Sequence, residues 1–151
     1  MRLEHDGYSI DDDPARVDVG IVTRFLTDHA YWGRWRTPAD LRKQIAEAWR
    51  VVGVYAADGT QVGFARATSD EVSEAYLGDV FVVPEHRGRG LSKRLVELMI
   101  DRGSGAHLRW TLFTSDAHGL YSQFGFREPG PTAMVRLGTF ASRPLEDESL
   151  E

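Results

Sequence analysis

The residues best suited to chemistry form a basic, glycine-rich turn that follows an apolar segment of the sequence. Gly88 and Gly90 lack a Cβ and so let a ligand approach the backbone closely, while Arg87, Arg89 and Lys93 surround them with positive charge. An amphipathic helix is predicted to begin at this turn. The first N–H groups of a helix have no partner within it and, with the helix dipole, attract anions. The turn therefore predicts a binding site for a phosphate or pyrophosphate group.

Two familiar phosphate-binding motifs do not fit this turn. A P-loop requires a glycine, four further residues and then Gly-Lys-Ser or Gly-Lys-Thr, and no segment of the chain has that spacing. The dinucleotide fingerprint requires a third glycine where Lys93 stands, and it belongs early in a parallel sheet, whereas hairpin strands are predicted before this turn. A tight connection that binds nothing is the alternative, but such a turn does not require three cations beside it.

Hydrophobic periodicity predicts that helices and strands alternate around this turn, which indicates an α/β or α+β domain. The predicted strands span residues 8–10, 51–57, 61–68, 75–83, 108–113 and 133–137. The predicted helices span residues 18–28, 37 to about 49, 88–102 and 117–124. Thr37-Pro38 with Asp40 is typical of a helix start, and Asp58-Gly59 is typical of a tight hairpin turn. Either Ser115 or Asp116 is predicted to cap the last helix.

The composition excludes several classes of protein. The chain has 151 residues, enough for one domain with its own core, and it has no cysteine, which excludes disulfides, thiolate metal sites and cysteine nucleophiles. Its formal net charge of −5 argues against nucleic-acid binding. Neither a membrane-spanning run nor a signal-peptide pattern is present, so we expect a cytoplasmic protein that contacts no membrane. Residues 1–140 are predicted to form one domain, and the acidic residues 141–151 a flexible tail.

The turn and the apolar segment before it resemble motif A of the GNAT acetyltransferase superfamily. That motif has an apolar strand, Val-x-Pro, and then Arg or Gln, two residues, Gly, one residue, and Gly or Ala at the start of a helix. Here Val82-Val83-Pro84 matches the first part and Arg87-Gly88-Arg89-Gly90-Leu91-Ser92 matches the second. Ser92 takes the place of the final Gly or Ala and is similarly small.

A second motif downstream adds to the resemblance. Motif B of the family has an alanine, Leu-Tyr and Gly-Phe at fixed offsets, which Ala117, Leu120-Tyr121 and Gly125-Phe126 reproduce. Thr114 replaces the asparagine that is common seven residues before the tyrosine, which puts its contact with the cofactor arm in question. With both motifs in order and at the family's spacing, the chain is identified as a member of the GNAT superfamily of N-acetyltransferases.

The resemblance implies both a fold and a cosubstrate. The fold is a mixed, mostly antiparallel central sheet flanked by helices and splayed between its two central strands. The cosubstrate is acetyl-CoA, and no metal is expected. The backbone of Val80, Phe81 and Val82 would pair with the pantetheine arm as an added strand does. The remaining cofactor contacts would come from Arg87, Gly88, Arg89, Gly90, Leu91, Ser92 and Lys93 at the pyrophosphate and from Thr114 at the arm.

The implied reaction is direct transfer of the acetyl group to a primary amine of a small molecule within a ternary complex. An N–H at the strand end near Val82 is the candidate donor to the developing oxyanion. Tyr121 matches the family's acid, which protonates the departing thiolate; its ordinary pKa near 10 suits that exchange. The alternative is that Tyr121 only belongs to the apolar stripe of its helix.

The base that accepts the amine proton has two candidates. Asp79 lies within an otherwise apolar predicted strand, where a carboxylate is costly unless it is paired or used. It could accept the proton, bind a cationic substrate, or form a buried ion pair with Arg66 on the preceding strand. His118, one helical turn from Tyr121, is the second candidate, with a solvent-facing position as its alternative.

The acceptor site is expected to involve the N-terminal part of the chain, as in similar proteins. Tyr31 and Trp32, with Trp35, form an aromatic segment that could hold a ring or an ammonium group, or could simply anchor its own loop. Two other functions remain open: a non-catalytic acyl-CoA-binding or sensing module, and a protein N-acetyltransferase. Because dimers are common among similar proteins, a homodimer is compatible with the resemblance.

Overall fold

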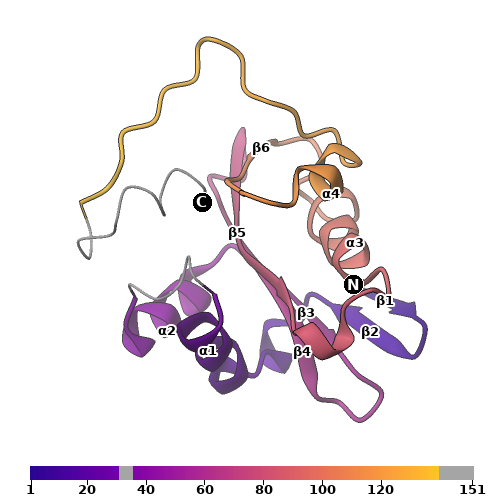
Figure 1. Cartoon of the computed structure of the whole chain (residues 1–151). Helices are drawn as coiled ribbons and strands as arrows, with labels where there is room; N and C mark the ends of the chain where they lie inside the picture. Colours follow the sequence, from indigo (N-terminus) through magenta and orange to yellow (C-terminus); the bar gives the residue numbers. More distant parts are fainter. Residues whose placement is uncertain (31–35, 140–151) are drawn as a thin grey trace.

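The computed structural model describes residues 1–30 and 36–139. Within these residues, six strands form one sheet in the order in which they occur along the chain (Figure 1). They are β1 (Arg2–His5), β2 (Tyr8–Asp11), β3 (Arg50–Tyr55), β4 (Gln61–Ser69), β5 (Glu74–Val82) and β6 (Arg109–Thr111). Neighbouring strands are antiparallel except for β5 and β6, which run parallel. This topology confirms the predicted mixed, mostly antiparallel sheet.

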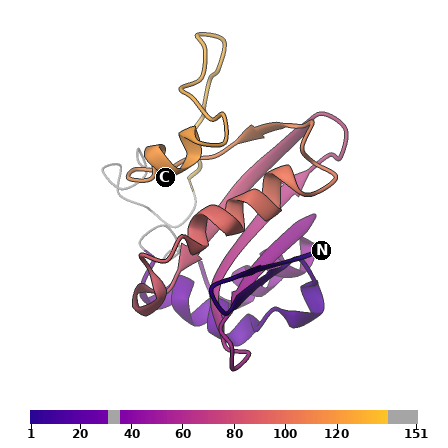
Figure 2. The same ribbon diagram turned by 90° about the vertical axis from the view of Figure 1, so that its right-hand side faces the viewer.

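Helices cover both faces of this sheet (Figures 1 and 2). On one face lie α1 (Val19–Asp28) and α2 (Pro38–Glu47), and on the other lie α3 (Leu91–Val96) and α4 (His118–Ser122). α3 continues directly into a π-helical segment, η3 (Glu97–Asp101). Two short 3-10 helices, η1 (Pro14–Arg16) and η2 (Pro84–His86), lie in the connections. In the part of the chain that is described, no helix has the length and apolar character needed to cross a membrane.

Alternating side chains of the strands form two apolar cores, one on each face of the sheet. The core under α3 and α4 includes Val52, Ala65, Leu77, Leu95 and Met99. The core under α1 and α2 includes Val22, Leu26, Leu41, Phe64 and Phe81. Because successive residues of a strand point to opposite faces, Phe64 and Ala65 of β4 belong to different cores.

The start of α2 follows the predicted capping pattern. The Asp40 amide donates to Thr37 Oγ1 at 3.1 Å, and the Thr37 amide donates to Asp40 Oδ2 at 2.9 Å. Pro38 occupies the first helical position, where its missing N–H costs nothing. This reciprocal cap fixes where the chain turns back toward the sheet after the α1–α2 connection.

β5 departs from regular strand geometry at Asp79. Between the Phe64–Phe81 and Arg66–Gly78 pairs, β5 has one residue more than β4, which is a β-bulge. Asp79 has a φ of +54°, a backbone conformation that residues other than glycine seldom adopt. The bulge therefore changes the direction of the strand just before residues 80–82.

β5 and β6 separate along their length. The parallel pairing joins Glu74, Ala75 and Tyr76 of β5 to residues 109–111 of β6. Among the described residues, no strand pairs with the β6-facing edge of residues 77–82. The sheet is therefore splayed between these two strands, as predicted, and the second half of β5 has an open backbone edge.

Three sequence-based assignments were wrong. Residues 133–137 do not form a strand, and Met134 is 94% exposed there, so their alternating pattern does not correspond to a buried face. β1 was not predicted because its four residues include no run of β-branched or aromatic side chains. The helix predicted from residue 88 begins only at Leu91, since Gly88 and Gly90 have φ values of +79° and +77°.

Candidate active site

The glycine-rich turn connects the end of β5, through η2, to the start of α3. Gly90 is the N-cap of α3, and its left-handed backbone explains why a glycine stands there. No side chain of the described residues caps the helix, so the first amides of α3 lack a side-chain acceptor. This geometry supports the predicted anion site, because the unpaired amides lie in a segment of the chain that also carries Arg87, Arg89 and Lys93.

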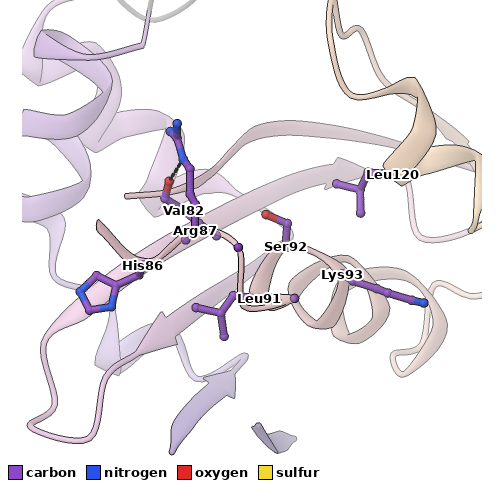
Figure 3. Close-up of a pocket in the computed structure, with 9 residues that line it drawn as sticks. Val82, His86, Arg87, Leu91, Ser92, Lys93 and Leu120 are labelled. Carbon is purple, nitrogen blue, oxygen red and sulfur yellow. Dashed lines mark hydrogen bonds between the residues drawn. The ribbon is translucent and has the colours of Figure 1, made fainter. Parts of the chain in front are cut away.

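A hollow of about 220 Å³ lies at this turn (Figure 3). Its walls combine predicted cofactor residues with two residues that were not predicted there, one from η2 and one from α4. They are Val82, His86, Arg87, Gly88, Gly90, Leu91, Ser92, Lys93 and Leu120. Arg89 is absent from this set, and its carbonyl oxygen faces β1 instead. Leu120 immediately precedes Tyr121, so the helix that carries the predicted acid also contributes to the wall of the hollow.

Arg87 joins the turn to the end of β5. Its Nε donates to the carbonyl oxygen of Val82 at 2.8 Å, as the dashed line in Figure 3 shows. One nitrogen of this guanidinium is therefore used within the protein, and its other N–H groups are not needed for that bond. The bond also fixes the position of the turn relative to residues 80–82.

The N-terminal hairpin holds the turn from the other side, which the sequence did not predict. His5 Nε2 of β1 lies 2.8 Å from the carbonyl oxygen of Arg89, and the Tyr8 hydroxyl of β2 lies 2.7 Å from His86 Nδ1. The partners are 84 and 78 residues apart in the chain. No local pattern signals such contacts, because they depend on how the sheet brings β1 and β2 beside α3.

Residues 80–82 present their backbone at the open edge of β5. The side chains of Phe81 and Val82 are buried in opposite cores, and Phe81 stacks on Phe25 with ring centroids 3.9 Å apart. These side chains thus hold the strand rigidly, while the edge that faces away from β4 has no strand partner among the described residues. An extended ligand can pair with such an edge.

Tyr121 is buried in the core under α3 and α4. It is 7% exposed and packs edge-on against Phe126, with ring centroids 5.8 Å apart. Burial, with smaller contributions from the charges of Asp116 and Tyr76, raises the pKa of Tyr121 to about 12. This is above the ordinary value near 10 expected from the sequence, so the phenol holds its proton throughout the physiological range.

α4 has Ala117 as its N-cap, with no side-chain hydrogen bond at the cap, and Thr114 orders the turn just before it. Its Oγ1 accepts the amide of Ala117 at 3.1 Å and that of Asp116 at 3.4 Å. The prediction that Ser115 or Asp116 caps this helix was therefore wrong. The hydroxyl of Thr114 keeps its own hydrogen for donation to another group.

Asp79 lies in a buried ion-pair cluster. Arg36 donates to Asp79 Oδ1 through Nη2 at 2.7 Å and to Oδ2 through Nη1 at 2.8 Å, and Arg66 Nε donates to Oδ2 at 2.6 Å. Burial alone would raise the pKa of Asp79, but the hydrogen bonds and charges of Arg36 and Arg66 outweigh it and hold the pKa below its ordinary value. The ion-pair alternative thus describes this carboxylate, and the sequence missed Arg36 as its second partner.

The remaining predicted site residues that the structure describes do not line the hollow at the turn. His118 is the first residue of α4 and is exposed, which agrees with its solvent-facing alternative. Tyr31, Trp32 and Trp35 lie outside the described residues. Across residues 1–30 and 36–139, no group of three or more histidine, aspartate and glutamate side chains could hold a metal ion.

Comparison with known proteins decides the family. The model of the acetyltransferase (GNAT) domain matches residues 48–128, which include the turn, the bulge and Tyr121. The chain belongs to the GNAT acetyltransferase family. A crystal structure from Xanthomonas campestris, described as that of a GNAT-family acetyltransferase, is 38% identical in sequence with a TM-score of 0.82. The alignment covers 89% of this chain and 96% of that one.

Two matches of lower identity also cover most of the chain. A protein of Gibberella zeae that is named as an acetyltransferase is 27% identical in an alignment 135 positions long, which covers 77% of this chain and 76% of that protein. A GNAT-family structure from Streptococcus pneumoniae is 18% identical with a TM-score of 0.70, covering 87% of this chain and 98% of that one. At 18% identity, this likeness shows a shared fold and nothing further.

Proposed function

We propose that this GNAT protein transfers the acetyl group of acetyl-CoA directly to a primary amine of a small molecule, in a ternary complex. The main support is a convergence: the uncapped start of α3, Val82 at the end of the open edge of β5, and Leu120 of α4 line one hollow, and Tyr121 follows Leu120 in the same helix. A phosphate site, a strand edge and a proton donor are what a CoA thioester requires from a protein.

The turn would hold the pyrophosphate. The amides of Leu91, Ser92 and Lys93 at the start of α3, together with the charges of Arg87 and Lys93, complement its negative oxygens. The backbone of Val80, Phe81 and Val82 would pair with the pantetheine amides at the open edge of β5. Thr114, which keeps a free hydroxyl hydrogen, would contact the same arm.

Tyr121 would act as the general acid. In the transfer, the amine nitrogen forms a bond to the thioester carbonyl carbon, the carbon–sulfur bond breaks, and the sulfur takes the phenolic proton. A backbone N–H near Val82 would stabilise the oxyanion. Because burial keeps the phenol protonated, the acid is in its active form before the thioester arrives. The proton lost by the amine would return the phenolate to its neutral form.

Asp79 would act as a positioning group for two arginines. A carboxylate whose pKa is lowered by two guanidinium groups is a weak base, so it accepts the amine proton poorly. His118 is exposed one turn before Tyr121 and is the candidate that would pass to water the proton that an ammonium group must lose before it attacks. The second proton, lost from the nitrogen after the attack, is the one that returns to Tyr121. A pH–rate profile of His118→Ala that keeps the acidic limb of the wild type would remove His118 from this role.

The proposal is tested by combining calorimetric titration of acetyl-CoA with a thiol-release assay over a panel of amines. We expect acetyl-CoA to bind and thiol to be released with at least one small amine. Binding without release on any small amine, peptide or protein would indicate the non-catalytic module instead. Release only with peptides or proteins would indicate a protein N-acetyltransferase, and an acetylated enzyme that chases to product would contradict direct transfer.

A further inference from the structure

Arg66 of β4 is a buried cation whose donors are only partly used. The residue is 9% exposed, and its Nε donates to Asp79 Oδ2 at 2.6 Å. Among the described residues nothing accepts a hydrogen bond from Nη1 or Nη2 of Arg66. Neither nitrogen belongs to the fully buried polar atoms that lack a partner, so both reach solvent. The terminal fork of this guanidinium therefore remains for a further acceptor.

The neighbouring carboxylate does not provide a full countercharge for Arg66. Arg36 donates to both oxygens of Asp79, at 2.7 and 2.8 Å, and Arg66 must share that same carboxylate. Burying a cation beside a shared anion is costly, and a second anion at the fork of Arg66 would lower that cost. Two guanidinium groups share one carboxylate, so the group that this cluster would bind is an anion.

The guanidinium of Arg66 lies over Gly78 of β5. A Cβ placed on Gly78 would be 3.5 Å from Arg66 Nη2 and 3.1 Å from Cε1 of Tyr76, so these two side chains flank a residue that has none. Tyr76 is in turn close enough to Tyr121 for its charge to affect the pKa of that phenol. Arg66, Tyr76 and the proposed acid therefore follow one another near the point where β5 and β6 separate.

The fork also lies on the sheet face opposite to the cofactor turn. Arg66 and Phe64 are two residues apart on β4 and share a face, and Phe64 belongs to the core under α1 and α2. The hollow at the glycine-rich turn lies at the start of α3, on the other face. An acceptor bound by Arg66 would thus approach the thioester from the α1/α2 face of the sheet, whereas acetyl-CoA would be held on the α3 face.

We propose that Arg66 binds an anionic group, a carboxylate or a phosphate, carried by the acceptor amine. This inference rests on the proposed acetyltransferase function and narrows its acceptor to amines that bear such a group a short chain away from the nitrogen. The planar fork of an arginine matches both anions with two parallel hydrogen bonds. The amino group of the acceptor would then point past Gly78 toward Tyr121.

The experiment compares kcat/KM for matched pairs of amines in the thiol-release assay. The pairs are amino acids and their amides, and O-phosphoethanolamine and ethanolamine, so the two arms distinguish a carboxylate from a phosphate. We expect the anionic member of at least one pair to be preferred by about 10-fold or more. Equal use of both members in every pair would overturn the proposal while leaving the acetyltransferase function standing.

Two variants of Arg66 assign the preference to its guanidinium. Arg66→Gln should lower kcat/KM for the preferred anionic amine on the order of 100-fold, mostly through KM, and leave its neutral partner unchanged. Arg66→Lys should recover part of the loss because it keeps the charge without the fork. Arg42→Gln, an equal change of charge at an exposed position of α2, is the matched control and should change neither amine.

Two further measurements keep the outcomes distinct. Titration of acetyl-CoA into Arg66→Gln checks that the variant is folded, since the cofactor turn lies on the other face. Titration of the anionic amines into the wild type in the presence of CoA measures acceptor binding without turnover. Arg66-dependent binding without acetyl transfer would refute the proposed function alone. Equal losses for the anionic and the neutral amine in a folded Arg66→Gln would refute the role of Arg66.

Discussion

Tyr121 and Asp79 are both buried ionisable side chains, but their surroundings favour opposite forms. Around Tyr121 burial dominates and raises the pKa to about 12, which keeps the phenol neutral. Around Asp79 burial is outweighed by Arg36 and Arg66, which keep the carboxyl charged. The first environment suits a proton donor, and the second suits a fixed anchor for two cations.

Replacing the phenol tests its proposed role as the acid. Tyr121→Phe should lower kcat about 100-fold or more, while the Kd for acetyl-CoA stays within a few-fold, because the ring still packs against Phe126. The active form of Tyr121 is the protonated one, and its raised pKa means that the proton is lost only as the pH approaches 12. The wild-type kcat should therefore show no falling limb from this group between about pH 7 and 10. A falling limb in that range that disappears in Tyr121→Phe would contradict the assignment.

The ion-pair cluster predicts a pH-dependent loss of stability. Asp79→Asn leaves two buried guanidinium groups without their carboxylate and should lower the free energy of unfolding by about 3 kcal/mol at neutral pH, measured by urea denaturation. Because the folded pKa of Asp79 is lowered, its contribution is fully present above the unfolded pKa near 3.8 and is lost as the pH falls through the folded value. Asp101→Asn at an exposed position is the control. Equal stability of the two variants would show that the cluster contributes little.

At the scale of elements, the sequence predicted best where the pattern is local. Thr37 and Asp40 form the predicted capping box, and Asp58-Gly59 lies between β3 and β4 as a hairpin turn requires. The glycines were recognised as a turn before a helix, although Gly88 and Gly90 precede α3 and do not form its first turn. Residues 133–137 were wrongly assigned as a strand, and β1 was not predicted, because a strand forms only where a partner strand lies beside it. Pairing between distant segments leaves no local signal.

The candidate site shows the same division between local and distant signals. Asp79 was recognised as costly from its apolar neighbours, and Arg66 was named because the predicted hairpin puts it on the adjacent strand. Arg36 arrives from the α1–α2 connection, 43 residues away in sequence, and could not be foreseen. His5 and Tyr8 were missed for the same reason.

The β1–β2 hairpin should influence cofactor affinity through the turn. Tyr8→Phe removes the hydroxyl that bonds His86 at 2.7 Å and leaves the buried ring in place. One lost hydrogen bond of about 1 kcal/mol predicts a rise in the Kd for acetyl-CoA of about fivefold, with kcat little changed. His107→Ala, at an exposed position away from the hairpin, is the control. If calorimetry gives the same Kd for Tyr8→Phe and the wild type, the hairpin does not support the turn.

At the scale of the whole molecule, the splay between β5 and β6 leaves backbone groups for a ligand to complete. Acetyl-CoA that pairs with β5 and also contacts the starts of α3 and α4 would connect elements that the sheet alone does not join. Ligand at 100 times its Kd stabilises the folded state by about 2.7 kcal/mol. The Tm should therefore rise by roughly 5–10 °C in a scanning fluorimetry experiment.

A glycine variant serves as the control for this thermal shift. Gly90→Val forces a branched side chain into a φ of +77°, at a distance of 3.4 Å from His5 Nε2. The substitution should displace the start of α3 and abolish most of the rise in Tm. An undiminished shift in this variant would show that the turn is not where the cofactor binds.

Because adjacent residues of β4 serve different faces of the sheet, Phe64 and Ala65 belong to separate networks of packing. A library of substitutions confined to the α1/α2 side can therefore be screened for new amine preferences with little penalty to cofactor affinity. Laboratory evolution of this chain should accordingly change its preference among acceptor amines in few mutational steps. Substitutions on the α3 side would be selected against, because they weaken the binding of acetyl-CoA, which every acceptor requires.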